Sequence, residues 1–370
     1  MSKPLSISTL VFWPALTLSY IAAWINGFRM PNLWSINYFI PSIFEGFYRR
    51  SLLGTATYFL GNFRFQYHTI AAIQFAVFIA LNIVIIRACI KRGDQFKWFW
   101  ILFLLSPAGG YFFDEVGYIE QMLYLLMFAA LASPSKLLAA IVILASMWIH
   151  EMALFTTIPL YIGYLLLQQR PWKEVFTITA ASLMCFGILY FFFQTTAPEN
   201  LSQFLSAAAQ LADHPIRQDY YTVFSNKFIG QRFQWYFSIN EIKNIALITP
   251  LWVVVAYGFS KSASSLFAKI IFFTSGLIIC LCPLILGTFG WDVHRWIFLS
   301  ISSTLCCIYW VSNKLSARLS WAIVILFALF SFFGNLEYFD GYTPRLSNWP
   351  APVKFLKEEF PGIIFTIPQH

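Results

Sequence analysis

Four short stretches of the sequence place acidic side chains beside arginine or histidine in otherwise apolar surroundings. They are EGFYRR with Glu45, Arg49 and Arg50, FFDEVGYIEQ with Asp114, Glu115 and Glu120, WIHEM with His150 and Glu151, and GWDVHRW with Asp292, His294 and Arg295. Carboxylates and imidazoles can take a proton from a hydroxyl, and arginine can hold a phosphate through two parallel hydrogen bonds. These residue types predict acid–base chemistry on a phosphorylated substrate.

A fifth stretch, residues 216–237, mixes basic and aromatic side chains. Arginine binds phosphate, and aromatic faces stack on sugar rings. The predicted phosphate ligands here are Arg217 and Arg232, and the predicted sugar-stacking residues are Tyr220, Tyr221, Trp235 and Tyr236, together with Trp291 of the fourth stretch. An amphipathic helix resting on anionic lipid headgroups would have the same composition, so that alternative stays open.

Each acidic stretch also has a purely structural alternative. On a helix, Glu45 and Arg49 would be four residues apart and could form a surface salt bridge. The acids of FFDEVGYIEQ could simply keep two helix ends in water. A buried histidine such as His150 is often only a hydrogen-bonded part of the structure. The GWDVHRW loop favours function more strongly, because Arg295 in an outer loop opposes the usual charge bias of membrane proteins.

The composition predicts a membrane protein. Of the 370 residues, 59% are hydrophobic, 20% are aromatic and only 11% are charged. A soluble domain carries about 25% charged residues, whereas lipid covers most of the outside of a membrane protein.

Apolar stretches long enough to span, or nearly span, a bilayer recur along the whole chain. We expect an all-α bundle of about eleven spans (10–12), near residues 8–25, 68–90, 98–113, 118–133, 137–150, 153–169, 174–193, 244–259, 269–289, 296–312 and 319–335. Residues 1–370 then form a single membrane domain. We expect the first stretch to be retained rather than removed as a signal peptide.

The charge of the connecting loops predicts the orientation. With the N-terminus inside, the inner loops contain twelve basic residues against Asp94 and Glu174, out of 24 basic and 16 acidic residues in all. The basic residues are Lys3, Arg87, Lys91, Arg92, Lys97, Lys136, Arg170, Lys173, Lys261, Lys269, Lys314 and Arg318. Short basic inner loops orient membrane proteins. They also account for the net charge of +8 without a nucleic-acid partner.

This orientation places every long connection outside. The long segments are residues 26–67, residues 194–243 and the C-terminal tail 336–370. Residues 33–47 and the following SLLGTATYFLG piece are too apolar for free solution and too short to span. We therefore expect interfacial or re-entrant helices there, and a short amphipathic helix over residues 201–212.

Several classes of chemistry are disfavoured. The sequence has no glycine-rich phosphate loop, no serine-nucleophile elbow and no CxxC motif. The six cysteines lie in apolar stretches, and no pattern of metal ligands occurs, so we expect neither a metal nor a cofactor. The middles of the spans are nearly free of ionisable residues, which argues against an ion-coupled pump.

The layout resembles that of the C-type glycosyltransferases. An inner N-terminus, a first outer loop with surface helices and an acid, many spans and a late large outer loop carry this resemblance. It implies sugar transfer from a polyprenyl-phosphate donor on the extracytoplasmic face, with Glu45 in the place of the first-loop catalytic acid. That class usually has aspartate there, so Asp114 or Asp292 could serve instead. The chain is also similar in size and aromatic richness to bacterial O-antigen polymerases and ligases.

From these features we expect an enzyme of the bacterial inner membrane that transfers a sugar or oligosaccharide to a surface polysaccharide or a lipid-linked acceptor. Its partners would be a polyprenyl-linked donor, membrane lipids and possible polysaccharide-assembly proteins. Two alternatives remain: a lipid or glycan flippase or other transporter, and a membrane acyltransferase that modifies surface glycans. The flippase alternative predicts a cavity that reaches both faces.

Overall fold

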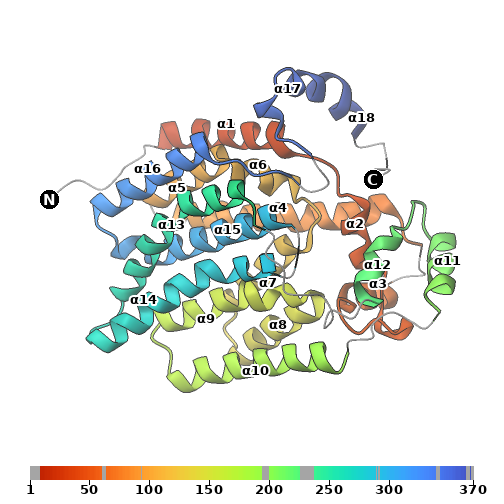
Figure 1. Ribbon diagram of the computed structural model, residues 1–370, viewed down its shortest axis with the longest axis horizontal. Helices are drawn as coiled ribbons and strands as arrows, with labels where there is room; N and C mark the ends of the chain where they lie inside the picture. Colours follow the sequence, from red (N-terminus) through yellow and green to blue (C-terminus); the bar gives the residue numbers. More distant parts are fainter. Residues whose placement is uncertain are drawn as a thin grey trace.

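The computed structural model describes residues 9–60, 64–92, 94–193, 200–225, 237–288, 290, 292–338, 342–363 and 367. Long helices lie side by side in a bundle, with a group of short helices at one end (Figure 1). Among the described residues no strand forms, and the β pairing is confined to an isolated bridge between Phe65 and Ala212. The predicted all-α class is confirmed.

Each apolar stretch predicted from the sequence coincides with helix. In the first half the helices are α1 (Thr9–Gly27), α4 (Tyr67–Arg92), α5 (Asp94–Leu105), α6 (Pro107–Asp114), α7 (Ile119–Ala132), α8 (Lys136–Ile149), the 3₁₀ segment η3 (Glu151–Phe155) and α9 (Thr157–Leu167). In the second half they are α10 (Trp172–Phe191), α13 (Ile239–Ser260), α14 (Leu266–Leu281) with its extension η5 (Cys282–Thr288), α15 (Val293–Val311), η6 (Ser312–Lys314) and α16 (Ala317–Phe333). The stretch 98–113 is broken between α5 and α6, where Pro107 follows Ser106.

Serine fixes where many of these helices begin. The side chain of an N-cap serine accepts a hydrogen bond from a backbone N–H group that the first turn leaves unpaired. The serines that do so are Ser106 for α6, Ser135 for α8, Ser238 for α13, Ser265 for α14 and Ser316 for α16. The sequence therefore sets both the apolar body of each helix and its starting residue.

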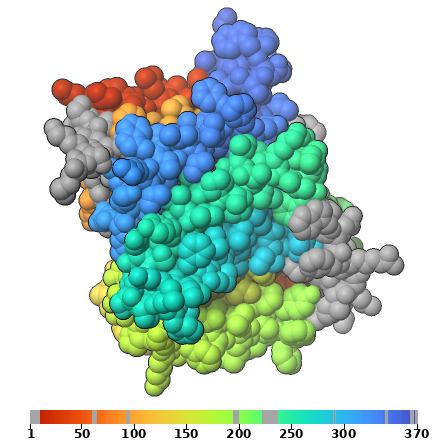
Figure 2. Space-filling model, turned by 60° about the vertical axis from the view of Figure 1, so that its left-hand side comes forward, coloured from red at the N-terminus to blue at the C-terminus, as the bar shows by residue number. Residues whose placement is uncertain are grey.

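The helices define a membrane protein. Among the described residues, six helices are long and apolar enough to cross a membrane, or seven if the bent pair α6–α7 is one span. Four further apolar helices are shorter, with 10–17 residues each. Figure 2 shows α16, the α13–α14 pair and α10 following one another across one face of the molecule. Large apolar side chains such as Phe176, Phe267 and Phe332 are exposed on these helices, as expected of a surface covered by lipid.

Helix α15 is the central helix of the bundle. Its apolar window is 72% buried, against 17–44% for the other five long helices. Small polar side chains allow this close packing, since Ser300 donates a hydrogen bond to the carbonyl oxygen of Cys280 on α14 at 2.6 Å. Small residues and short polar side chains are typical of helix contacts in membranes.

The two ends of the bundle differ in their polar contacts. We call one the ion-pair end, where Arg29 pairs with Asp114, Arg50 with Glu151 and Arg295 with Glu120. We call the other the lysine end, where Lys136 pairs with Glu174, and where Gln169 and Lys314 donate hydrogen bonds to Ser262. Helix α15 runs between them, because Arg295 lies in its first turn and Lys314 follows its last.

The segment after α1 consists of short helices that are only partly folded into the protein. It contains α2 (Leu33–Ile36), η1 (Asn37–Phe39), η2 (Ile43–Glu45) and α3 (Leu52–Leu60). Residues 33–42 are almost all buried, whereas Phe44 and Phe59 are exposed, so the placement predicted for this segment, interfacial or re-entrant, stays a prediction. Gly46 ends η2 with a φ of 86°, a left-handed conformation that glycine adopts without strain.

The second long connection covers the first. Helix α11 (Leu201–Leu211) forms the predicted amphipathic helix, and α12 (Gln218–Ser225) follows it. Asp213 accepts a hydrogen bond from the backbone N–H group of Tyr67 at 2.8 Å and so caps α4. The Asn37 amide donates to the carbonyl oxygen of Arg217 at 3.1 Å. These contacts join the two connections into one cap.

The C-terminal part returns to α1, as Figure 1 shows. It contains η8 (Arg345–Ser347), α17 (Ala351–Lys354), the π-helical turn η9 (Phe355–Glu359) and α18 (Phe360–Ile363). The indole of Trp24 packs edge-on against Phe355 and Phe360, with ring centroids 5.2 and 4.8 Å apart. The backbone N–H group of Leu346 donates to the side-chain oxygen of Asn26 at 2.9 Å.

Candidate functional site

A largely buried ion pair, with side chains 10% and 21% exposed, links two parts of the chain that the sequence analysis singled out separately. The Nε atom of Arg50 donates to both carboxylate oxygens of Glu151, at 3.1 and 3.0 Å, and its Nη2 atom donates to one of them as well. Arg50 lies just before α3, whereas Glu151 begins η3. The backbone of Arg50 is left-handed, with a φ of 55°, which costs on the order of 1–3 kcal/mol for a residue other than glycine. The surrounding contacts hold this strained residue in place.

His150 lies beside this pair and is kept neutral. Its Nδ1 atom accepts a hydrogen bond from the backbone N–H group of Met152 at 3.1 Å, so the proton resides on Nε2. Burial, together with the positive charge of Arg50, holds the pKa of His150 well below its usual range, although Glu151 partly opposes the shift. His150 is therefore a poor general base. Its available function is to donate a hydrogen bond from Nε2.

A second ionic group is centred on Arg295 in the first turn of α15. Its guanidinium pairs with Glu120, lies 3.6 Å from Glu115 and 3.6 Å from Asp292, and stacks over the ring of Tyr118 at 4.5 Å. Glu115 and Glu120 are 1% and 2% exposed. The chain places them inside because α6 and α7 are bent by 98° at the residues between them. The alternative that these acids merely keep helix ends in water is wrong.

Tyr38 joins the two groups. Its ring lies 5.8 Å from that of His150, and the residue is close enough to Arg295 for their charges to interact. It is also close enough to Arg50 for their charges to interact. We call this whole assembly the arginine–carboxylate cluster: Tyr38, Arg49, Arg50, Glu115, Glu120, His150, Glu151, Asp292 and Arg295. Arg49 is buried next to Arg50, and burial lowers its pKa.

Asp292 has the chemistry of a base within this cluster. It precedes α15, and burial raises its pKa to about 6, although Arg295 partly offsets the shift. A carboxylate with a pKa close to the working pH accepts protons more readily than an ordinary one. Its Oδ2 atom has no hydrogen-bond partner among the described residues. Asp292 is therefore the candidate base that burial and charge favour.

Three of the predicted catalytic residues, Asp114, His294 and Glu45, lie outside the arginine–carboxylate cluster. Asp114 is bound by Arg29, with 2.8 Å between Arg29 Nε and Asp114 Oδ1, so it ties the end of α1 to α6. Its carboxylate is committed to that contact. His294 lies 3.2 Å from Glu241 and 3.8 Å from Glu337.

Glu45 is also apart from the cluster. It is exposed, and it accepts a hydrogen bond from the hydroxyl of Ser42 at 2.9 Å. The predicted helix face shared by Glu45 and Arg49 does not form, because η2 ends at Glu45 and Gly46 turns the chain. Arg50 pairs with Glu151 instead. The position that the resemblance assigns to a first-loop catalytic acid, Glu45, is therefore on the surface of the protein.

The aromatic residues of the second connection serve packing. Tyr220 and Tyr221 are both 0% exposed. The ring of Tyr220 meets Trp34 and Tyr38 edge-on at 5.2 and 5.3 Å, which leaves no free face for the predicted sugar stacking. Arg217 pairs with Asp219 at 2.6 Å on the surface rather than in the cluster. The predictions for Arg232, Trp235, Tyr236 and Trp291 lie outside the described residues.

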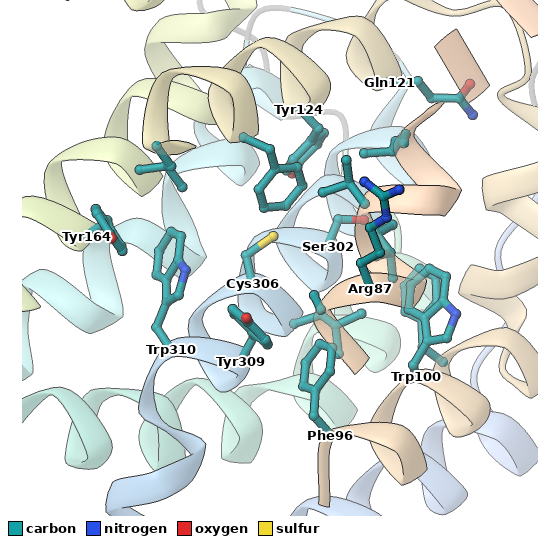
Figure 3. A pocket seen from close by; sticks show the side chains of 18 of the residues that line it. Arg87, Phe96, Trp100, Gln121, Tyr124, Tyr164, Ser302, Cys306, Tyr309 and Trp310 are labelled. Atoms are coloured by element: carbon teal, nitrogen blue, oxygen red, sulfur yellow. The ribbon is translucent and has the colours of Figure 1, made fainter. Parts of the chain in front are cut away.

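A large cavity ends at the cluster. Its volume is about 790 Å³, and α4, α5, α7, α9 and α15 surround it (Figure 3). The lining is mainly aliphatic and aromatic, with Glu115, Glu120 and Gln121 in its wall. The side-chain oxygen of Gln121 has no hydrogen-bond partner among the described residues. A cavity of this kind suits a ligand with a long apolar part.

Sequence reasoning did not find every member of the site. Tyr38 lies in a run of aromatic residues, so nothing in the sequence distinguishes it from its neighbours. Arg29 was not considered as the partner of Asp114. The signal for Arg29 was its charge in a predicted outer loop, where arginine opposes the usual bias. The cavity had no signal, because cavity-lining and lipid-facing side chains are equally apolar.

No family model, curated protein or solved structure matches the chain. Within the part of the chain that the structure describes, no three His, Cys, Asp or Glu side chains are placed to hold a metal ion. The fold and the site define a class: a helical membrane protein with a buried arginine–carboxylate cluster at one end of an apolar cavity.

Proposed function

We propose that the protein is an inner-membrane glycosyltransferase of the kind that the C-type layout suggests. It transfers a sugar or oligosaccharide from a polyprenyl-linked phosphate donor to an acceptor on the extracytoplasmic face. The single observation that supports this most is the buried cluster, in which Asp292 lies beside Arg295 and Arg50 pairs with Glu151. A donor with an anionic phosphate as its leaving group needs this combination, because a carboxylate accepts the proton of the acceptor and cations stabilise the phosphate.

Four groups in the cluster have a part in such a transfer. Asp292 accepts the proton of the acceptor hydroxyl, whose oxygen attacks the anomeric carbon of the donor sugar. The bond from that carbon to the phosphate oxygen breaks, and Arg49 and Arg50 stabilise the phosphate that leaves. His150 donates a hydrogen bond from Nε2. Buried cations stabilise developing negative charge more strongly than cations in water.

The proposal includes the membrane topology of eleven spans with the N-terminus inside. Its support is that loops predicted on one side contact each other: Lys136 pairs with Glu174, and Lys314 bonds to Ser262, at the lysine end. We expect a periplasmic reporter such as alkaline phosphatase to be active when fused after residue 363 and inactive when fused in the 261–265 loop. The reverse pattern would invert the orientation.

Complementation of a deletion strain tests the function. We expect loss of a surface polysaccharide, or of part of its length, in the deletion strain. Wild type and Glu45→Gln should restore it, because Glu45 is exposed and remote, whereas Asp292→Asn should not. Each variant needs a wild-type amount of protein in the membrane. An unchanged polysaccharide in the deletion strain, or full restoration by Asp292→Asn, would refute the assignment.

The raised pKa of Asp292 predicts that the rate of sugar transfer depends on pH. A base works only when deprotonated, and the pKa of this carboxyl is raised to about 6. We therefore expect sugar transfer in membrane vesicles to fall tenfold per pH unit below about 6 and to level off above pH 7. Incorporation of a labelled sugar between pH 4.5 and 8 measures this. A flat profile across that range would exclude Asp292 as the base.

A flippase remains the second candidate, because charged residues line the cavity at both ends. Glu115 and Glu120 lie at one end, and Arg87, Lys91 and Lys314 at the other. A transported lipid would need polar groups at each end of its path. Purified protein in vesicles separates the two functions: a flippase moves a labelled glycolipid across the bilayer with its sugar–phosphate bond intact, whereas the transferase breaks that bond.

A further inference from the structure

The cavity extends along most of the bundle. On α15 and the following η6 its lining runs from Phe298 to Lys314, and on α7 from Glu120 to Ala132. At 1.5 Å per helical residue these stretches are about 24 and 18 Å long. The hydrocarbon core of a bilayer is about 30 Å thick. An occupant of this cavity is therefore long, apolar and parallel to the helices.

Positive charge collects at the lysine end of the cavity. Arg87 and Lys91 come from the last two turns of α4, and Lys314 follows the last turn of α15. Arg87 and Lys91 are four residues apart on one helix face, where like charges repel each other. The acids that line the cavity, Glu115 and Glu120, belong to the opposite end. Three cations thus line this end of the cavity.

Among the three cations, Arg87 gives the strongest indication that an anionic ligand binds. It is exposed, and Figure 3 shows its side chain extending into the cavity beside Ser302. No hydrogen bond or ion pair of Arg87 occurs within the described residues. Cys306 and Tyr309 line the same space from α15, so the side chain of Arg87 enters a cavity whose walls are largely apolar. A charge in such surroundings is costly without a partner.

We propose that the cavity binds one anionic phospholipid, with its phosphate at Arg87, Lys91 and Lys314 and its hydrocarbon chain directed toward Tyr124. The apolar walls bind the chain, and the cations bind the phosphate. This site goes beyond the proposed function. Its headgroup lies at the lysine end, the length of α15 from Arg295, so this lipid is distinct from a donor that reacts at the cluster.

Lipid binding to purified, delipidated protein tests the proposal. The probes are phosphatidylglycerol, zwitterionic phosphatidylethanolamine of the same chains, and inorganic phosphate. Thermal shift and native mass spectrometry give the affinity. We expect phosphatidylglycerol to bind at least tenfold more tightly than phosphatidylethanolamine, and inorganic phosphate to have no effect, because it lacks the chain.

Two variants locate the site. Arg87→Gln should weaken phosphatidylglycerol about tenfold, the loss of one charge-assisted hydrogen bond. Ser302→Phe should exclude the chain without touching a cation. The matched control is Lys269→Gln, an exposed lysine of α14 that does not line the cavity, and it should bind as wild type does.

Three results would overturn the proposal. The first is equal affinity for the two phospholipids. The second is unchanged binding in both Arg87→Gln and Ser302→Phe, or an equal loss in Lys269→Gln. The third is tighter binding of polyprenyl phosphate than of phosphatidylglycerol through Arg87, which would make the cavity a donor site. None of these measurements involves sugar transfer, so they remain decisive if the proposed function fails.

Discussion

Replacing Arg295 with glutamine should lower the free energy of unfolding by about 3–5 kcal/mol, the usual effect of removing one partner from a buried ion pair. The guanidinium lies among Glu120, Glu115 and Asp292, and its side chain is only 6% exposed. Without it these carboxylates lose their compensating charge in a buried site. Thermal and chemical unfolding of the purified protein in detergent would measure the loss.

A surface pair provides the control. Arg217 and Asp219 are joined at 2.6 Å, but the side chain of Asp219 is 54% exposed. Exposed pairs contribute about 0–1 kcal/mol, so Arg217→Gln should have little effect. In the double variant Arg295→Gln with Glu120→Gln, one charge of each sign is removed. We expect it to be about 1–3 kcal/mol more stable than the sum of the single effects predicts.

Equal unfolding free energies for Arg295→Gln and Arg217→Gln would contradict this account. That result would mean that the Arg295 group is hydrated in solution. Strict additivity in the double variant would mean that Glu120 is not the partner that matters, and the same cycle with Glu115→Gln would then identify it.

The sequence predicts the helices of this protein well, because their signals are local. An apolar run and an N-cap serine lie within a few residues of each other, as Ser135 and the start of α8 do. The sequence also indicates which charged groups share one end of the bundle. Ionisable groups at the ends of apolar runs lie at two levels, and Arg50 and Glu151, which are 101 residues apart, are both predicted at the outer level.

The exact partners could not be predicted, because they depend on the order of helices in the bundle. Glu45 and Arg49 have suitable spacing, yet a glycine turn directs Arg50 to Glu151 instead. The buried face of each helix is also hidden, since lipid-facing and core-facing side chains are both apolar. Helix α15 is an exception in hindsight: its serines and cysteines are suited to close packing at the centre.

Neutralising both members of the Arg50–Glu151 pair should separate stability from activity. Arg50→Gln or Glu151→Gln alone leaves one buried charge without its partner and should destabilise the protein by about 3–5 kcal/mol. The double variant leaves no charge and can retain a hydrogen bond between the two amides. We expect its unfolding temperature to return close to that of wild type.

Activity should not return with stability. If Arg50 stabilises the departing phosphate, the stable double variant still lacks that cation and should transfer sugar about 10²–10³ times more slowly, the usual effect of losing one such group. Arg50→Lys should not restore the rate, because an ammonium group lacks the planar fork that binds Glu151 and a phosphate. Full activity of the double variant would mean that the pair only holds η3 beside α3, and that the phosphate is bound elsewhere.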